Sequence, residues 1–181
     1  MKFCHQCGSA RVEYRVPEGD NRPRHICPDC GYIHYVNPRM VVGCVPEWGE
    51  RILLCRRAIE PRLGYWTTPA GFMEIGETLE QAAARETLEE ACAQVEVQDM
   101  FAVVNVVHAE QVHIMFRAAM LNEDYAAGDE SLEVGLFHEH EIPWQEIAFA
   151  SVRFSLERFF RDRAEGTRRL HITEAPRVKV R

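Results

Sequence analysis

Hydrophobic and polar positions alternate through the middle of the chain. Along residues 112–120, the apolar positions that share one face of an extended chain are Val112, Ile114, Phe116, Ala118 and Met120. This period of two predicts a strand buried on one side. Further apolar runs predict strands at residues 40–46, 51–57, 95–97, 100–107 and 132–137.

The segments between these runs carry turn signals. Gly49 lies in a short polar segment that joins the first two runs, so we expect them to form a hairpin. Residues 66–71, WTTPAG, are interrupted by Pro69 and Gly71, and we expect no regular structure there.

A helical period replaces the alternation in two places. Thr78 and Gln81 form a capping box that predicts a helix from residue 79 to about Cys92. Its expected buried stripe consists of Ala84, Leu88, Ala91 and Cys92. A second helix is expected from Ser151, as N-cap, to Glu165 before Gly166, with a core stripe of Val152, Leu156, Phe159 and Phe160. Strands and helices in this order predict a mixed α/β fold.

The first 36 residues contain too few apolar side chains to form a core unaided. They contain two CxxC pairs, each followed by a glycine that can adopt a left-handed turn: Cys4, Cys7, Cys27 and Cys30. Four thiolates at this spacing predict a closed, structural Zn²⁺ site, and the duplicated pair disfavours a redox CxxC. Cys44, Cys55 and Cys92 lie in apolar or helical patterns and are expected to be buried free thiols.

Composition and charge narrow the function classes. We expect a zinc ribbon at residues 1–36, a catalytic domain at 37–165 and a basic, solvated tail at 166–181 that includes Arg168, Arg169, Arg177, Lys179 and Arg181. The net charge of −7 disfavours sequence-independent binding to nucleic acid. No apolar run approaches the ~20 residues of a membrane span, and we expect no membrane partner and a cytoplasmic location.

Three carboxylates share one face of the first helix. Glu86, Glu89 and Glu90 lie within about a third of its circumference, which we expect to be opposite Leu88. On an arbitrary helix this pattern is most often an ordinary solvated acidic face. Here the helix follows a loop with glycines, residues 69–76, that can bring backbone close to phosphates, and Arg85 can hold a carboxylate through paired hydrogen bonds. The context therefore favours a site for a hard metal such as Mg²⁺.

Residues 71–93, GFMEIGETLEQAAARETLEEACA, resemble the Nudix box, Gly-x5-Glu-x7-Arg-Glu-U-x-Glu-Glu-x-Gly-U, in which U is a bulky apolar residue. The matching positions are Gly71, Glu77, Arg85, Glu86, Glu89 and Glu90. Thr87, Cys92 and Ala93 depart from the pattern, at positions that concern packing and helix capping.

The resemblance implies a Nudix fold, a mixed sheet between helices, and hydrolysis of a pyrophosphate bond. It implies that Glu86, Glu89 and Glu90 bind Mg²⁺ or Mn²⁺, that Arg85 orients a glutamate, and that Glu77 anchors the loop or joins the metal site. Gly71 and Gly76 are the candidate phosphate-loop glycines. The general base stays open between Glu90 and the outlying acids Glu130 and Glu133, whose ordinary interpretation is a turn and a strand edge.

A zinc ribbon before a Nudix domain is similar to two groups of enzymes. The NADH and NAD-capped RNA diphosphatases carry a signature resembling Ser-Gln-Pro-Trp-Pro-Phe-Pro-x-Ser, which residues 100–116 lack. The FAD and ADP-ribose diphosphatase group shares residues 37–44, NPRMVVGC, and 53–57, LLCRR. This second resemblance implies FAD or ADP-ribose as substrate, AMP as a product, and a homodimer. A nucleic-acid-binding regulator with an inactive Nudix domain is the alternative from another class.

Overall fold

The computed structural model describes residues 1–176, and the chain forms two compact units, Met1–Asn37 and Pro38–Arg181. The first unit contains a small antiparallel sheet in the order β1-β2-β3. Its strands are β1 (Glu13–Arg15), β2 (Arg24–Ile26) and β3 (Ile33–His34). Gly8 and Gly31 both have φ of 74°, which confirms the left-handed turns expected after the two CxxC pairs.

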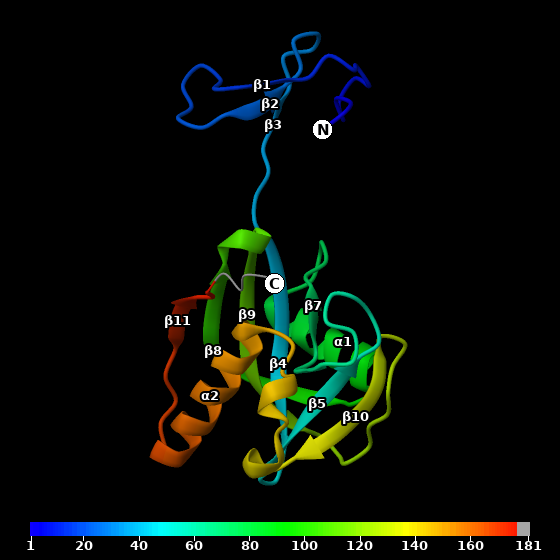
Figure 1. The fold of residues 1–181 in the computed structure, drawn as a ribbon, viewed down its shortest axis with the longest axis vertical. Helices are drawn as coiled ribbons and strands as arrows, with labels where there is room; N and C mark the ends of the chain where they lie inside the picture. Colours follow the sequence, from blue (N-terminus) through cyan, green and yellow to red (C-terminus); the bar gives the residue numbers. More distant parts are fainter. Residues whose placement is uncertain (177–181) are drawn as a thin grey trace. The chain divides into compact units, whose positions relative to one another are not determined.

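The second unit is built on a mixed sheet, as predicted (Figure 1). The path of the sheet is β10-β5-β4-β9-β8-β11, with β6 paired to β5 and β7 paired to β4. The β4/β9 and β8/β11 pairs are parallel and the other pairs are antiparallel. The strands are β4 (Arg39–Trp48), β5 (Arg51–Arg57), β6 (Trp66–Thr67), β7 (Ala70–Phe72), β8 (Val95–Val106), β9 (Gln111–Met120), β10 (Ser131–Phe137) and β11 (His171–Glu174).

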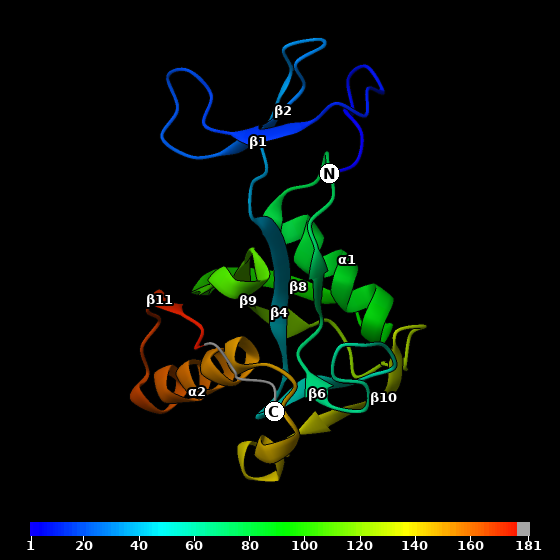
Figure 2. The ribbon, with the colours of Figure 1, turned by 45° about the horizontal axis from the view of Figure 1, so that its top comes forward.

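Two long helices cover opposite faces of this sheet, α1 (Leu79–Ala91) and α2 (Ala150–Glu165) (Figure 2). The alternation along β9 explains the two layers: Ile114 and Phe116 pack with Ala82 and Ala83 of α1, whereas Met115 packs with α2. Short 3₁₀ turns complete the unit at Val107–Ala109, Glu139–Glu141 and Trp144–Glu146. The period-two pattern correctly placed Ile114, Phe116 and Ala118 on one face of β9, but the strand is buried on both faces and not on one side alone.

The predicted stripe of α1 is wrong except for Ala91, and Cys92, which was expected in the stripe, is exposed. Leu88 is 50% exposed, and the residues of α1 that are buried are Ala82, Ala83, Glu86, Thr87, Glu90 and Ala91. The helix turns small residues toward the sheet because β4 and β7 pack closely against it, and the same face carries Glu86 and Glu90. These glutamates therefore lie on the buried side of the helix and not opposite its core stripe.

The ends of the helices are as predicted in three of four cases. Thr78 caps α1 through the expected capping box, Cys92 ends it with φ of 49°, and Gly166 ends α2 with φ of 62°. The N-cap of α2 is Phe149 and not Ser151, and no side chain caps this end. Ser151 lies inside the first turn, where it is buried.

The expectation of irregular structure at residues 66–71 is also wrong. Thr67 pairs with Cys55 in β5, and Gly71 pairs with Val42 in β4. Pro69 lies between the two short strands, so its missing N–H interrupts no ladder bond, and its carbonyl accepts from the Cys44 amide at 3.3 Å. These strands bring the segment before α1 onto the sheet.

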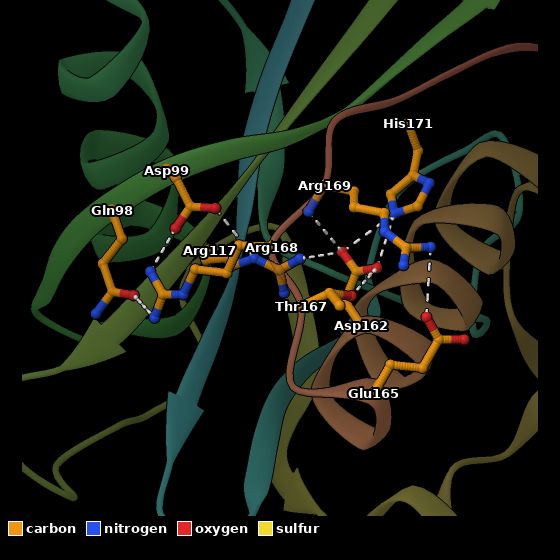
Figure 3. Close-up of polar contacts among 9 residues, drawn as sticks. All are labelled: Gln98, Asp99, Arg117, Asp162, Glu165, Thr167, Arg168, Arg169 and His171. Atoms are coloured by element: carbon orange, nitrogen blue, oxygen red, sulfur yellow. Dashed lines mark hydrogen bonds and ion pairs between the residues drawn. The ribbon is translucent and has the colours of Figure 1, made fainter.

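Part of the predicted solvated tail is folded. Residues 171–174 form β11, which pairs in parallel with β8 from Ala102 to Asn105. Asp162, fully buried, accepts from Arg117 Nη2 at 2.6 Å and contacts His171 Nε2 at 3.1 Å (Figure 3). The buried carboxylate therefore links α2, β9 and β11. Arg177, Lys179 and Arg181 of the predicted tail lie outside the described residues.

Within residues 1–176, none of the helices combines the length and the apolar character that crossing a membrane requires.

Candidate active site

Arg85 is the centre of the polar cluster on α1. Its Nε donates to Glu77 Oε2 at 3.0 Å and its Nη2 donates to Glu77 Oε1 at 2.8 Å, a paired arrangement that fixes both groups. Nη2 also donates to the Phe72 carbonyl at 3.1 Å, so Arg85 ties the helix to β7. These bonds lower the pKa of Glu77 to about 2, and its carboxylate stays charged at any physiological pH.

The same guanidinium holds two further carboxylates of the helix. Arg85 Nη1 donates to Glu86 Oε1 at 2.7 Å and to Glu89 Oε2 at 3.0 Å. Glu86 is 8% exposed, whereas the side chain of Glu89 is 57% exposed. The predicted residues Glu77, Arg85, Glu86 and Glu89 are therefore neighbours, and Glu89 is the one that faces solvent.

Glu90 lies one turn further along the buried side of the helix. Its Oε2 accepts from the Ala70 amide at 3.2 Å, and the residue is 8% exposed. Burial raises the pKa of Glu90 to about 8, and burial also raises the pKa of Glu86. Each carboxyl is thus held in a place that disfavours its negative charge, which is the electrostatic situation that a bound cation relieves.

Two glycines allow backbone to approach these carboxylates. A Cβ at Gly71 would overlap the carboxyl group of Glu86, and a Cβ at Gly128 would overlap the carbonyl oxygen of Glu89. The Gly128 amide donates to the Glu90 carbonyl at 3.1 Å. Gly76, the other predicted loop glycine, has φ of 97° and supplies the turn before Glu77.

The donor set fits a hard divalent cation, although the carboxylates do not converge on one point. Three carboxylates, those of Glu77, Glu86 and Glu89, bind Arg85, and the Glu90 carboxylate follows on the same helix, bound to the Ala70 amide. Oxygen ligands of this kind are those Mg²⁺ prefers. In residues 1–176, however, only the four ribbon cysteines bring at least three ligand atoms within 4.8 Å of one another. Glu86 and Glu89 share Nη1 of Arg85, which lies between them.

The departures from the Nudix box are accommodated locally. Thr87 is fully buried, and its hydroxyl donates to the Ala83 carbonyl at 2.8 Å and contacts Cys44 Sγ at 3.0 Å. Cys92 takes the left-handed conformation expected of a glycine, and its amide donates to the Leu88 carbonyl. Ala93 is fully buried against β5 and β9.

The structure separates the two outlying acids. Burial is the main cause of the raised pKa values of Glu86 and Glu90, and Glu130 lies close enough to raise them slightly further through charge repulsion. Glu133 is directed to Arg56, with its Oε2 at 3.4 Å from Nη1. Sequence reasoning missed Ala70, Gly128 and Arg57 as neighbours of the cluster. Of these, Gly128 had a signal, a glycine two residues before Glu130.

The four cysteines of the first unit form the predicted zinc-ribbon site. Their sulfur atoms lie within 4.8 Å of one another, with Cys4 Sγ at 3.7 Å from Cys30 Sγ and Cys7 Sγ at 3.6 Å from Cys27 Sγ. Four thiolates complete a tetrahedral Zn²⁺ shell and leave no position for a reacting group. The site is structural.

Family models match both units of the chain. Residues 2–36 match the zinc ribbon described as Nudix N-terminal, and residues 37–167 match the NUDIX domain. The chain belongs to the Nudix family. The four-cysteine ribbon and the carboxylate helix of this Nudix hydrolase fall in the two matched regions.

A solved structure and a curated protein are similar to this chain, in agreement with the family assignment. A crystal structure of a NUDIX hydrolase from Nitrosomonas europaea superposes with a TM-score of 0.93 and 53% identity, over 96% of this chain and 98% of that one. An ADP-ribose pyrophosphatase of Methanocaldococcus jannaschii is 29% identical over 116 residues, which are 62% of this chain and 69% of that protein.

Relatives of a second kind match a shorter region. The NAD-capped RNA hydrolase NudC of Haemophilus influenzae (strain PittGG) is 38% identical over 89 residues, which are 47% of this Nudix chain and 31% of that protein. The match with NudC thus spans about a third of the length of the relative.

Proposed function

We propose that this Nudix protein hydrolyses the pyrophosphate bond of a nucleoside diphosphate-linked compound with the help of Mg²⁺ or Mn²⁺, and that its substrate is ADP-ribose or FAD. The observation that carries the proposal is the cluster in which Arg85 holds Glu77, Glu86 and Glu89 while Glu90 is bound to the backbone of β7. The similarity to a protein named ADP-ribose pyrophosphatase supports the substrate class.

Glu86, Glu89 and Glu90 would hold the metal. When bound, it supplies positive charge to the diphosphate and lowers the pKa of an attacking water. In the reaction, the water oxygen bonds to phosphorus, one anhydride P–O bond breaks, and two phosphate monoesters leave. From ADP-ribose these are AMP and ribose 5-phosphate.

The residues of the chain orient the reaction. Arg85 fixes the side chains of Glu86 and Glu89, so that their oxygen atoms need not be ordered when substrate binds. Glu90 is our candidate for the group that accepts the proton of the water, because its carboxyl lies one turn from Glu86 on the buried side of α1 and is oriented by the Ala70 amide. Glu130, exposed beside the cluster, is the second candidate.

A panel of FAD, ADP-ribose, NADH and a nucleoside triphosphate with Mg²⁺ or Mn²⁺ tests the proposal. We expect AMP from ADP-ribose or FAD and much slower cleavage of the triphosphate. Release of inorganic phosphate or pyrophosphate from the triphosphate as the main product would contradict it.

NAD-capped RNA is a second candidate substrate because of the 38% identity to the NudC protein over 89 residues. Capped RNA assayed beside free ADP-ribose separates the two. The homodimer and the cytoplasmic location stay predictions.

A further inference from the structure

Three rings form a row across the small sheet of the first unit (Figure 1). Tyr14 of β1 lies opposite His25 of β2, and His25 lies opposite His34 of β3. Residues that lie directly opposite one another in neighbouring strands project from the same face of a sheet. The ring centroids of Tyr14 and His25 are 4.8 Å apart. One face of the sheet therefore carries an aromatic row, which consists of Tyr14, His25 and His34.

His34 is buried at one end of this aromatic row and has an unused nitrogen atom. The residue is 5% exposed, and its Nε2 has no hydrogen-bond partner within residues 1–176. The rings of His5 and Tyr32 pack edge-on against it, with centroids at 5.2 Å and 4.7 Å. A buried polar atom without a partner costs free energy, so a ligand that forms a hydrogen bond with Nε2 would be stabilised there.

An open pocket lies beside the same end of the row. Its volume is about 520 Å³, which is enough for a nucleotide. Two of the residues that line it contact or pair with His34: His5 through its ring and His25 through the strand register. The lining residues are Met1, Lys2, Phe3, His5, His25 and Val36. The unpartnered imidazole thus lies between two rings that border the pocket.

The charges of the ribbon indicate which ligand fits this pocket. Among the residues that the structure describes, none that lines the pocket is acidic, and Lys2 makes no ion pair. The ribbon arginines Arg11, Arg15 and Arg24, in contrast, are paired with acids. A polynucleotide needs a track of free cations along its backbone, which these paired arginines do not offer. One free ammonium beside flat rings fits a single phosphate attached to one aromatic base.

We propose that the zinc ribbon carries a binding site for one free nucleotide. The base stacks against the aromatic row, an atom at the edge of the base forms a hydrogen bond with His34 Nε2, and Lys2 binds the phosphate. The site lies in the first unit and uses none of the residues of the carboxylate cluster. It requires no bond cleavage, so it goes beyond the proposed function and does not depend on it. The ribbon then binds a nucleotide in addition to holding its structural zinc.

Titration of adenosine and of AMP into the full, zinc-loaded chain, without added divalent cations, tests the site. Two-dimensional NMR of the backbone amides reports binding at the ribbon through the signals of residues 5, 25 and 34, separately from any nucleotide bound elsewhere in the chain. We expect both ligands to shift these signals saturably. AMP should bind several-fold more tightly than adenosine, because only AMP has a phosphate for Lys2.

Tyr14→Ala should weaken both ligands about fivefold, because it removes a ring on which the base stacks. Tyr35→Ala is the matched control, since Tyr35 is 61% exposed and Tyr14 is 65% exposed. The ring of Tyr35 lies 5.2 Å from the guanidinium of Arg24, which precedes His25 in β2 and projects from the opposite face of the sheet. We expect Tyr35→Ala to bind both ligands like the wild type.

Two further variants separate the polar contacts. Lys2→Gln should lower the affinity for AMP to that for adenosine and leave the affinity for adenosine unchanged. His34→Phe keeps a ring but removes Nε2, and we expect it to weaken both ligands about fivefold. The same variant should keep or raise Tm, because it removes a buried polar atom that has no partner in the free protein.

Three results would overturn the site: no saturable shift of the ribbon signals in the wild type, equal losses in Tyr14→Ala and Tyr35→Ala, or a 5′-phosphorylated single-stranded RNA that binds the ribbon more than tenfold more tightly than AMP. The last result would assign the face to nucleic acid. If one variant loses its zinc, the others still decide. A chain that binds AMP at the ribbon but cleaves no diphosphate would contradict the proposed function and leave the ribbon site standing.

Discussion

Arg85 binds Glu77 through two hydrogen bonds, Nε to Oε2 at 3.0 Å and Nη2 to Oε1 at 2.8 Å, while its Nη1 donates to both Glu86 and Glu89. One guanidinium therefore sets the positions of three carboxylates. The geometry of the cluster therefore depends on the planar shape of the Arg85 guanidinium as well as on its positive charge.

Replacing Arg85 with Lys should lower kcat, on the order of 10²-fold, although the positive charge is kept. An ammonium group cannot donate to three carboxylates in the planar arrangement of the guanidinium, so Glu86 and Glu89 lose their fixed positions. Steady-state kinetics with ADP-ribose check this, with Arg153→Lys as the control. Equal kcat in Arg85→Lys and wild type would show that the paired geometry is not needed.

The stability of the metal-free protein should fall between pH 4.5 and about 8 through Glu90. Burial raises the pKa of its carboxyl to about 8, against 4.5 for an ordinary glutamate, so in this window the native state binds more protons than the unfolded state. Urea unfolding without divalent cations, at pH 5, 6.5 and 8, compares wild type with Glu90→Gln. We expect the free energy of unfolding of Glu90→Gln to increase relative to that of the wild type as pH rises. A difference that does not change with pH would contradict the raised pKa of Glu90.

Added Mg²⁺ should reverse this trend. A metal ion competes with the proton for Glu90, so the stabilisation by Mg²⁺ is expected to be larger at pH 8 than at pH 6. In Glu90→Gln the pH dependence of the stabilisation should be reduced.

Loss of zinc should unfold the first unit and leave the second folded. Residues 1–37 and 38–181 are separate compact units, and the first depends on its four thiolates for stability. Cys7→Ser is expected to release zinc and to remove the weaker of two calorimetric transitions. Cys92→Ser, at an exposed cysteine outside the cluster, should retain both. If Cys7→Ser loses both calorimetric transitions, the second unit does not fold independently of the first, which would contradict this prediction.

Asp162→Asn should destabilise the second unit by about 3–5 kcal/mol. The carboxylate is fully buried and accepts from Arg117 Nη2 at 2.6 Å and from the Arg169 amide at 3.3 Å, so its loss leaves the buried guanidinium with the partly exposed Asp99 as its one counter-charge among the described residues. Urea unfolding measures the difference. Glu157→Gln, which breaks an exposed pair with Arg153, should cost less than about 1 kcal/mol.

Much of the fold followed from local patterns. The alternation in β9, the capping box at Thr78 and the glycines after each CxxC pair are local signals, and the structure has them as predicted. The buried face of α1 could not be predicted in this way. The large residue Leu88 is exposed and Glu86 is buried because the face is selected by the close approach of β4 and β7, a tertiary effect.

The same limit applies to the candidate site. The shared face of Glu86, Glu89 and Glu90 was predicted from their spacing along one helix, and the resemblance to the Nudix box added the roles of Glu77 and Arg85. Ala70 and Arg57 could not be predicted, because they reach the cluster through sheet pairing. The sequence analysis missed β11 because the strand has only four residues, HITE, and none of them is fully buried. So short a segment gives no signal apart from the strand with which it pairs.

Hydrolysis of ADP-ribose and FAD by wild type, Glu89→Gln and Glu90→Gln, with and without Mg²⁺ or Mn²⁺, tests the central claim most directly. We predict AMP release that requires the divalent cation and falls at least 10²-fold in both variants, while their folded state and zinc content are unchanged. AMP release that survives in both variants, or none from wild type with either metal, would contradict the assignment of this carboxylate cluster as the catalytic site.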